Sequence, residues 1–255
     1  MHENQEKIEK LYCLAQDRFH QDDLPQAINS LKAVLQLDFK HLDAHFLLAQ
    51  IYQKDQSYEL SSQHFRTCIK EDYKKNELYK LIAFNSKQLA LYKNAIHELQ
   101  KHLHNNPLDD DAYALMGDIY FSQQEYHFAK KVYLEAISMN QKNSSYYFKL
   151  SHVYKIKGDL RQALLEAQKA LSLDLNYHEA YFLVATIYSN LKEYEKSIEY
   201  YKKAIAINNT IAIYHNNLAS VLNQLQRKEE ALESQKIALN LEPKNSQYQN
   251  NLNKL

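Results

Sequence analysis

The chain has 255 residues, of which 31 are basic and 31 acidic, so its formal net charge is zero. A balanced charge argues against a nucleic-acid-binding protein, which needs excess positive charge to displace counterions from phosphates. The chain has only two glycines, Gly117 and Gly158, whereas phosphate-binding loops need several close together, so nucleotide-binding loops of that kind are excluded and no cofactor is expected.

No stretch of 18 apolar residues occurs in the chain, and the polar residues at its start carry no apolar segment typical of a secretory signal. We therefore expect no membrane insertion and a cytoplasmic location.

A period of 34 residues organises almost the whole chain. One column of the repeat holds only small residues, namely Ala15, Ala49, Ala83, Gly117, Ser151, Ala185 and Ala219. A second small column follows twelve residues later, namely Ala27, Ser61, Ala95, Ala129, Ala163, Ser197 and Ala231. Repeats must be sought before single elements are assigned, and this register runs without an insertion or deletion. It predicts seven repeats, which span 8–41, 42–75, 76–109, 110–143, 144–177, 178–211 and 212–245.

Within each repeat, apolar residues at positions 4, 7, 8 and 11 have helical spacing, and a second apolar set follows at positions 20, 24, 27 and 28. Position 1 is the first residue of each range above. The polar break between the two sets, as at Lys157-Gly158-Asp159, predicts a turn between two helices. Small residues at positions 8 and 20 would let these helices approach closely.

The repeat at 110–143 resembles the tetratricopeptide repeat most clearly. Its matching residues are Tyr113, Met116, Gly117, Tyr120, Ala129, Tyr133 and Ala136. The resemblance implies an all-α fold, a right-handed superhelical α-solenoid of seven helix-turn-helix repeats. Residues 246–255 add a short C-terminal helix, and the whole chain, 1–255, is expected to form one solenoid domain. The chain departs from the family pattern in having no tryptophan.

The first repeat carries Lys10 and Asp17 where later repeats have mostly apolar residues, and Gln21 lies on the same flank. Since a repeat buries one flank against the repeat before it, we expect this polar flank to face water and the array to begin here. The seventh repeat has Lys228 and Gln235 on its outer flank, so we expect a complete module.

Two histidines, His41 at the end of the first repeat and His45 in the second, are four residues apart and could bind a metal from one helix face. No third ligand accompanies them, and His45 occupies a packing position, so we expect packing. His102 stands in a column of mostly small residues and is expected to pack rather than to bind metal with its neighbours His97 and His104.

The remaining chemistry-bearing residues are also explained without catalysis. We expect Cys13 and Cys68 to be buried, unreactive thiols. Five repeats have an acidic residue at position 2, namely Glu9, Asp43, Glu77, Asp111 and Glu179. A carboxylate there complements the helix dipole, which we favour over a stripe that attracts a basic peptide. No Ser-His-Asp or Cys-His signature occurs, so the sequence predicts no catalytic residue, no metal site and no enzyme.

Positions 5, 9 and 12 of the first helix lie opposite its partner helix, on the side that lines a concave groove in this family. Six of the nine phenylalanines fall there, and an exposed aromatic stripe marks a binding surface. The predicted partner-binding groove comprises Tyr12, Phe19, Phe46, Phe84, Lys87, Phe121, Phe148, His152, Lys155 and Phe182.

The resemblance implies a non-enzymatic protein–protein interaction scaffold that binds a peptide or protein segment in this groove. The alternative is a targeting or substrate-recruitment subunit of an enzyme complex whose catalytic part is a separate chain. Some family members grip a C-terminal carboxylate with Lys at position 5 and Asn at position 9. Here Lys80 is followed by Phe84, so a chaperone ligand of that kind is not expected.

Overall fold

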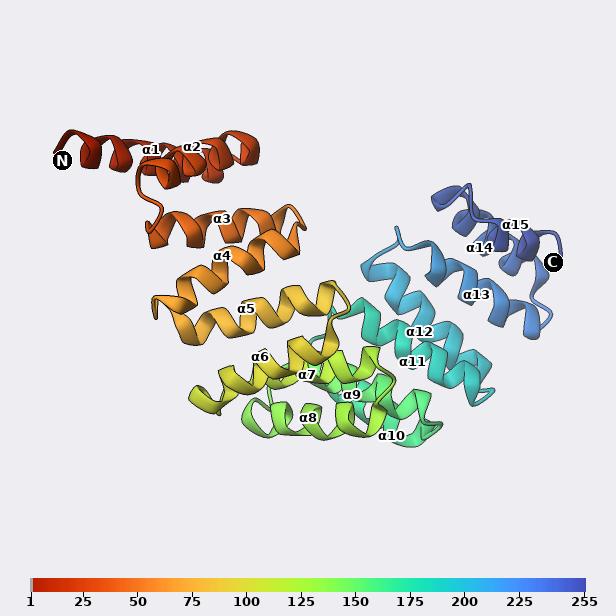
Figure 1. Ribbon diagram of the computed structural model, residues 1–255. Helices are drawn as coiled ribbons and strands as arrows, with labels where there is room; N and C mark the ends of the chain where they lie inside the picture. Colours follow the sequence, from red (N-terminus) through yellow and green to blue (C-terminus); the bar gives the residue numbers. More distant parts are fainter. Residues whose placement is uncertain (1) are drawn as a thin grey trace. The chain divides into compact units, whose positions relative to one another are not determined.

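The computed structural model describes residues 2–255 of the chain, and within that range it contains fifteen α-helices and no strand (Figure 1). The helices are α1 (His2–His20), α2 (Leu24–Leu37), α3 (Leu42–Lys54), α4 (Tyr58–Lys70), α5 (Lys75–Gln88), α6 (Tyr92–Asn105), α7 (Asp110–Ser122), α8 (Tyr126–Met139), α9 (Ser144–Ile156), α10 (Leu160–Leu173), α11 (His178–Asn190), α12 (Tyr194–Ile207), α13 (Ala212–Gln224), α14 (Lys228–Leu241) and α15 (Ser246–Leu252). The predicted all-α fold class is confirmed.

The helices form two compact units, one ending at Gln123 and one running from Gln124 to Leu255, and each is described by itself. In the first unit, which we call unit 1, the pairs α1–α2, α3–α4 and α5–α6 pack closely, and α7 packs against α6. In the second, unit 2, α9 packs against both α8 and α10, and the pairs α11–α12 and α13–α14 follow, with α15 against α14. Short turns separate successive helices, so the packing is mostly between neighbours along the chain.

The small columns lie where paired helices meet. Ala15 and Ala27 are completely buried between α1 and α2, and Ala163 is completely buried in α10. The hydroxyl of Ser151 on α9 donates to the carbonyl of Ala163 at 2.6 Å. A hydroxyl can therefore replace the methyl group of alanine in this column because its polar atom finds a backbone acceptor across the pair.

The turn between the two helices of each predicted repeat places one residue in the left-handed backbone region. These residues all occupy repeat position 15, and they are Asp22, Gln56, Ala90, Gln124, Gly158, Lys192 and Gln226, with φ between 56° and 81°. Only one of them is glycine, although a side chain makes this conformation unfavourable. In the first and fifth repeats the residue just before the second helix, Asp23 or Asp159, caps that helix, since its side chain accepts from a backbone N–H group.

Unit 1 also contains polar side chains that are buried and fully paired. The amide of Asn85 on α5 is completely buried, donates to the hydroxyl of Ser61 at 2.9 Å and accepts from Gln53 at 2.6 Å. These hydrogen bonds connect α3, α4 and α5. A buried polar group is tolerated in such a core because its hydrogen bonds are satisfied.

The two cysteines differ in exposure. Cys68 is completely buried, as predicted, and burial raises the pKa of its thiol to about 11. Cys13 is exposed, so the prediction of a buried thiol was wrong for this residue. Cys68 lies in the small column at position 27, whereas Cys13 lies at position 6, outside the apolar columns, so the position in the repeat decides the burial.

Candidate protein-binding surface

The ten residues predicted to line a groove are all half-buried in the structure. Six lie in unit 1 and four in unit 2. Several of their rings pack against the buried clusters of their own unit, as Phe19 does against the cluster that contains Leu48 and Phe182 against the cluster that contains Leu218. Neighbouring helices therefore cover part of each ring, and the aromatic residues are less exposed than the sequence pattern suggested.

In unit 2 two of the predicted phenylalanines belong to a longer row of rings. Phe148 on α9 lies 4.9 Å from the ring of Tyr177, which precedes α11. Phe182 on α11 stacks on Tyr214 of α13 with ring centroids 4.7 Å apart. The Tyr214 hydroxyl is 2.8 Å from Nδ1 of His178, so the rings are held by polar as well as apolar contacts. We call these five residues, Phe148, Tyr177, His178, Phe182 and Tyr214, the aromatic belt.

Sequence analysis missed three members of the belt. Tyr177 is the last residue of its predicted repeat, His178 is the first of the next, and Tyr214 lies at position 3, on the flank expected to pack against the preceding repeat. None of these positions belongs to the set from which the groove was predicted. The signal available in the sequence was the presence of aromatic residues at the starts of α9, α11 and α13.

Phe148, His152 and Lys155 share one face of α9, since they are spaced by four and three residues. The rings of Phe148 and His152 meet edge to face at 4.8 Å. Burial, together with the positive charge of Lys155, lowers the pKa of His152 to about 4. His152 is therefore neutral at neutral pH.

Lys155 is a half-buried cation whose pKa is lowered by burial. Within residues 2–255, no carboxylate lies within 4.0 Å of its ammonium group. A partly desolvated charge without a counterion is unfavourable for the folded state.

In unit 1 the corresponding polar residues are already paired. Lys87 on α5 forms an ion pair with Asp118 on α7 at 3.5 Å. The ammonium group of Lys74 lies 4.1 Å from the ring of Phe46 and covers it. Internal contacts therefore occupy the sites that could otherwise contact a ligand.

Three further predicted rings in unit 1 also contact neighbours within the unit. Tyr12 lies 5.2 Å from the ring of His41, and Phe84 meets Tyr58 edge to face at 6.2 Å. Lys54 lies 5.7 Å from the ring of Phe19. Phe121 is half-buried on α7.

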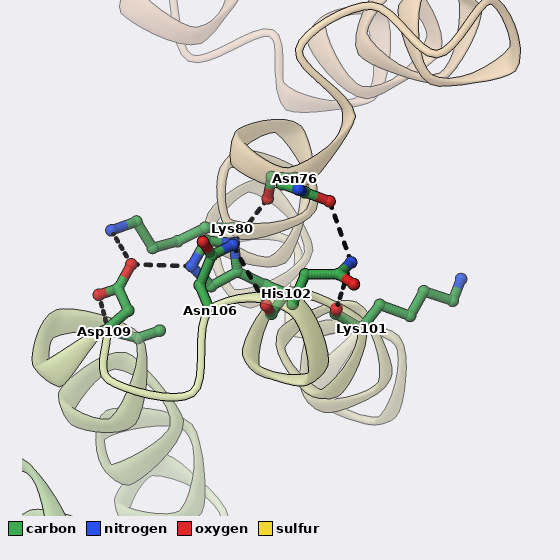
Figure 2. Close-up of polar contacts among 8 residues, drawn as sticks. Asn76, Lys80, Lys101, His102, Asn106 and Asp109 are labelled. Carbon is green, nitrogen blue, oxygen red and sulfur yellow. Dashed lines mark hydrogen bonds and ion pairs between the residues drawn. The ribbon is translucent and has the colours of Figure 1, made fainter.

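A polar network surrounds His102 where α6 ends and α7 begins (Figure 2). The ring nitrogens of His102 lie 2.6 Å from the carbonyl of Asn76 and 2.8 Å from a carboxylate oxygen of Asp109. The imidazole ring therefore lies between two hydrogen-bond acceptors, one on each ring nitrogen. The same carboxylate accepts from Lys80 at 2.7 Å. Burial acts to raise the pKa of Asp109, but the bonds from Lys80 and His102 lower it below its ordinary value.

His102 is thus buried, as predicted, but it is hydrogen-bonded as well as packed. His45 likewise bonds to His64, with the two Nδ1 atoms 2.7 Å apart. His97 and His104 are exposed. Within residues 2–255 no three His, Cys, Asp or Glu side chains are grouped as a metal site would require. In that same range, no helix is both long and apolar enough to cross a membrane.

Paired helices repeated along the chain, with a face of aromatic and polar side chains on the first helix of a pair, define a helical-repeat scaffold. The family model of the tetratricopeptide repeat matches residues 42–75, 110–143, 144–177, 178–211 and 212–245. The chain therefore belongs to the tetratricopeptide repeat family. The matched ranges coincide with five of the seven predicted repeats, while 8–41 and 76–109 remain predictions.

One curated relative is human tetratricopeptide repeat protein 21B, which is 30% identical over 95 residues. This match covers 36% of the chain and only 7% of that much longer protein. A tetratricopeptide repeat protein from Parabacteroides merdae has a similar structure, with a TM-score of 0.77, 16% identity and coverage of 97% of this chain and 98% of that one. YrrB, described as a TPR protein with an unusual peptide-binding site, gives a TM-score of 0.58 at 20% identity and covers 75% of this chain and 98% of its own. At these identities the two structures show a shared fold.

Proposed function

We propose that the chain is a non-enzymatic interaction scaffold that binds a peptide or protein segment, and that unit 2 carries the binding surface. The observation that carries this proposal is the aromatic belt together with the adjoining face of α9. Tetratricopeptide repeat proteins are generally non-catalytic scaffolds, and the peptide-binding site of YrrB gives a precedent on the same fold.

The belt has the composition of a binding surface. Rings contribute a large contact area with few rotatable bonds, and protein interfaces are enriched in tyrosine. Phe148 and Phe182 are half-buried, so each ring is already oriented by its neighbours and keeps part of its surface for a ligand. A ligand that covers an oriented ring loses little conformational entropy in the protein.

The ligand proposed here is an internal segment rather than a free C-terminus or a nucleic acid. Lys80, the lysine at the repeat position used by carboxylate-gripping relatives, is bonded to Asp109 at 2.7 Å. The zero net charge gives no basis for phosphate-backbone binding.

Phage selection tests this proposal directly. Random 12-residue peptides are selected on the immobilised full chain and on the variant Phe148→Leu/Phe182→Leu, which keeps apolar side chains against the core. The matched control is Phe39→Leu/Phe128→Leu, because these two phenylalanines are exposed and lie outside the belt. We expect wild type and control to enrich the same peptides, and the belt variant to bind them at least tenfold more weakly with a similar melting temperature. Equal binding by all three proteins would refute the proposal.

A further inference from the structure

Lys155 and Lys87 occupy the same position, 12, in two predicted repeats. Lys87 is paired with Asp118, which lies at position 9 of the following repeat. The residue at position 9 of the repeat that follows Lys155 is Thr186, which is neutral. Among the described residues, the lysine at position 12 thus has a carboxylate counterion in unit 1 and none within ion-pair distance in unit 2.

Thr186 cannot replace the missing carboxylate, because its hydroxyl is used within α11 and toward α12. It donates to the carbonyl of Phe182 at 2.8 Å and lies 3.3 Å from the hydroxyl of Tyr201. Tyr201 is almost completely buried, so this contact belongs to the core of unit 2. Lys155 projects from α9, which packs near α11, with no acidic residue within ion-pair distance among the described residues.

We propose that Lys155 binds a side-chain carboxylate, from Asp or Glu, of an extended acidic segment whose apolar side chain lies on the aromatic belt. This inference rests on the proposed function and adds the chemistry of the partner. The partner supplies the counterion that Asp118 supplies to Lys87 in unit 1. Ion pairs in such partly desolvated sites discriminate strongly, since an uncharged side chain would leave the ammonium group unpaired.

The spacing on α9 limits the ligand. Phe148 and Lys155 are seven residues apart, which corresponds to about 10 Å along a helix that rises ~1.5 Å per residue. An extended peptide advances ~3.3 Å per residue, so the same span corresponds to about three residues. We expect the apolar and acidic side chains of the ligand to be about three residues apart.

The first experiment selects C-terminally blocked 12-residue peptides on wild type, Lys155→Gln and Lys157→Gln. Lys157 is the control because it lies two residues further along the chain and is exposed. We expect wild type and Lys157→Gln to enrich Asp or Glu about three residues from an apolar residue, and Lys155→Gln to lose the acidic preference. A synthetic peptide from the selection should bind Lys155→Gln at least tenfold more weakly, and its Asp→Asn form should bind wild type with a similar loss.

A second variant reproduces in unit 2 the arrangement of unit 1. Thr186→Asp places a carboxylate at the position equivalent to Asp118, so it should pair with Lys155 and weaken binding of the acidic peptide at least tenfold. Thr186→Asn is the uncharged control and should bind nearly as wild type does. Circular dichroism verifies that each variant is folded.

The outcomes separate this inference from the proposed function. Belt-dependent peptides without acidic residues, or an Asp→Asn loss of the same size in wild type and Lys155→Gln, would overturn the acidic ligand and leave the proposed function standing. A selection that enriches no peptide over the belt variant would overturn both.

Discussion

Unit 1 and unit 2 are built from the same kind of repeat but treat their charged side chains differently. In unit 1, Lys80 and Lys87 are held by the carboxylates of Asp109 and Asp118. In unit 2, Lys155 and the neutral His152 are half-buried, and both have a lowered pKa. The helical scaffold therefore does not determine whether a half-buried lysine has a carboxylate counterion. The residue at the equivalent position of the next repeat determines it.

The largest expected effect in this comparison is the decrease in the free energy of unfolding as the pH falls. His152 has a pKa of about 4 in the folded chain, below the ordinary value of about 6.5. The unfolded chain therefore takes up a proton first as the pH falls, so this stability is complete above about pH 6.5 and is lost between about 6.5 and 4. One pKa unit corresponds to about 1.4 kcal/mol, so a difference of about 2.5 units gives a loss of roughly 3–4 kcal/mol.

Urea unfolding at several pH values between 7.5 and 4.5 measures this loss. His152→Gln should show a shallower dependence on pH than wild type, and His104→Gln, which changes an exposed histidine, should not. His64 in unit 1 also has a pKa lowered to about 4, first by burial and then by His45. His64→Gln should therefore remove a separate part of the slope. The same slope in wild type and both variants would contradict the assignment.

The next largest effect concerns the small residue between α9 and α10 in unit 2. Ala163 is completely buried, and its carbonyl accepts from Ser151 at 2.6 Å, so Ala163→Leu should overpack α9 against α10 and cost about 1–3 kcal/mol. Ala95→Leu makes the equivalent change in unit 1, where Ala95 is also completely buried. Gln168→Leu on the exposed side of α10 is the control. Chemical denaturation of the three variants measures the free energy of unfolding, and unchanged values would show that these columns do not separate the helices.

A smaller effect should have opposite signs in the two units. Lys87→Met removes a counterion from the half-buried Asp118 and should cost about 0.5–1.5 kcal/mol. Lys155→Met removes a partly desolvated charge that has no acidic partner within 4.0 Å among the described residues, and should raise stability by a few tenths up to about 1 kcal/mol. Thermal melts of the two variants test the comparison. A loss of stability in both would mean that Lys155 contributes a favourable internal contact.

The smallest effect is an electrostatic one within α9. Because the charge of Lys155 contributes to the lowered pKa of His152, Lys155→Gln should raise that pKa toward its ordinary value. NMR titration of the imidazole signals measures the change, with Lys157→Gln as the exposed control. Burial is the larger cause, so most of the lowering should remain. An identical titration in wild type and Lys155→Gln would show that the two side chains do not interact.

The helices could be predicted from the sequence because periodicity and side-chain volume are local properties. Ala15, Ala27 and Ala163 repeat at fixed intervals, and a small residue between two helices has the same consequence in any repeat. The residues that share one face of a helix could also be predicted, since the spacing of Phe148 and Lys155 alone places them on one side of α9.

Which side chains meet across helices could not be predicted in the same way. Tyr214 reaches both Phe182 and His178, and this depends on rotamers and helix packing rather than on repeat position. The contrast between Asp118 and Thr186 was present in the sequence, but its meaning required the observed ion pair of Lys87. The exposure of Cys13 was missed because residue type was given more weight than its position in the repeat.

The left-handed residue at position 15 of each repeat is a site at which the melting temperature of the chain can be changed. Six of the seven position-15 residues carry a side chain at φ between 56° and 63°, a conformation that costs about 1 kcal/mol more than in glycine. Exchanging Ala90 or Gln226 for glycine would release part of that cost in a turn that contains no residue of the aromatic belt. At Gly158 a Cβ atom would meet nothing within 4 Å, so the reverse exchange acts through the backbone alone. A series of such turn variants would differ in melting temperature and keep the same side chains on the binding surface.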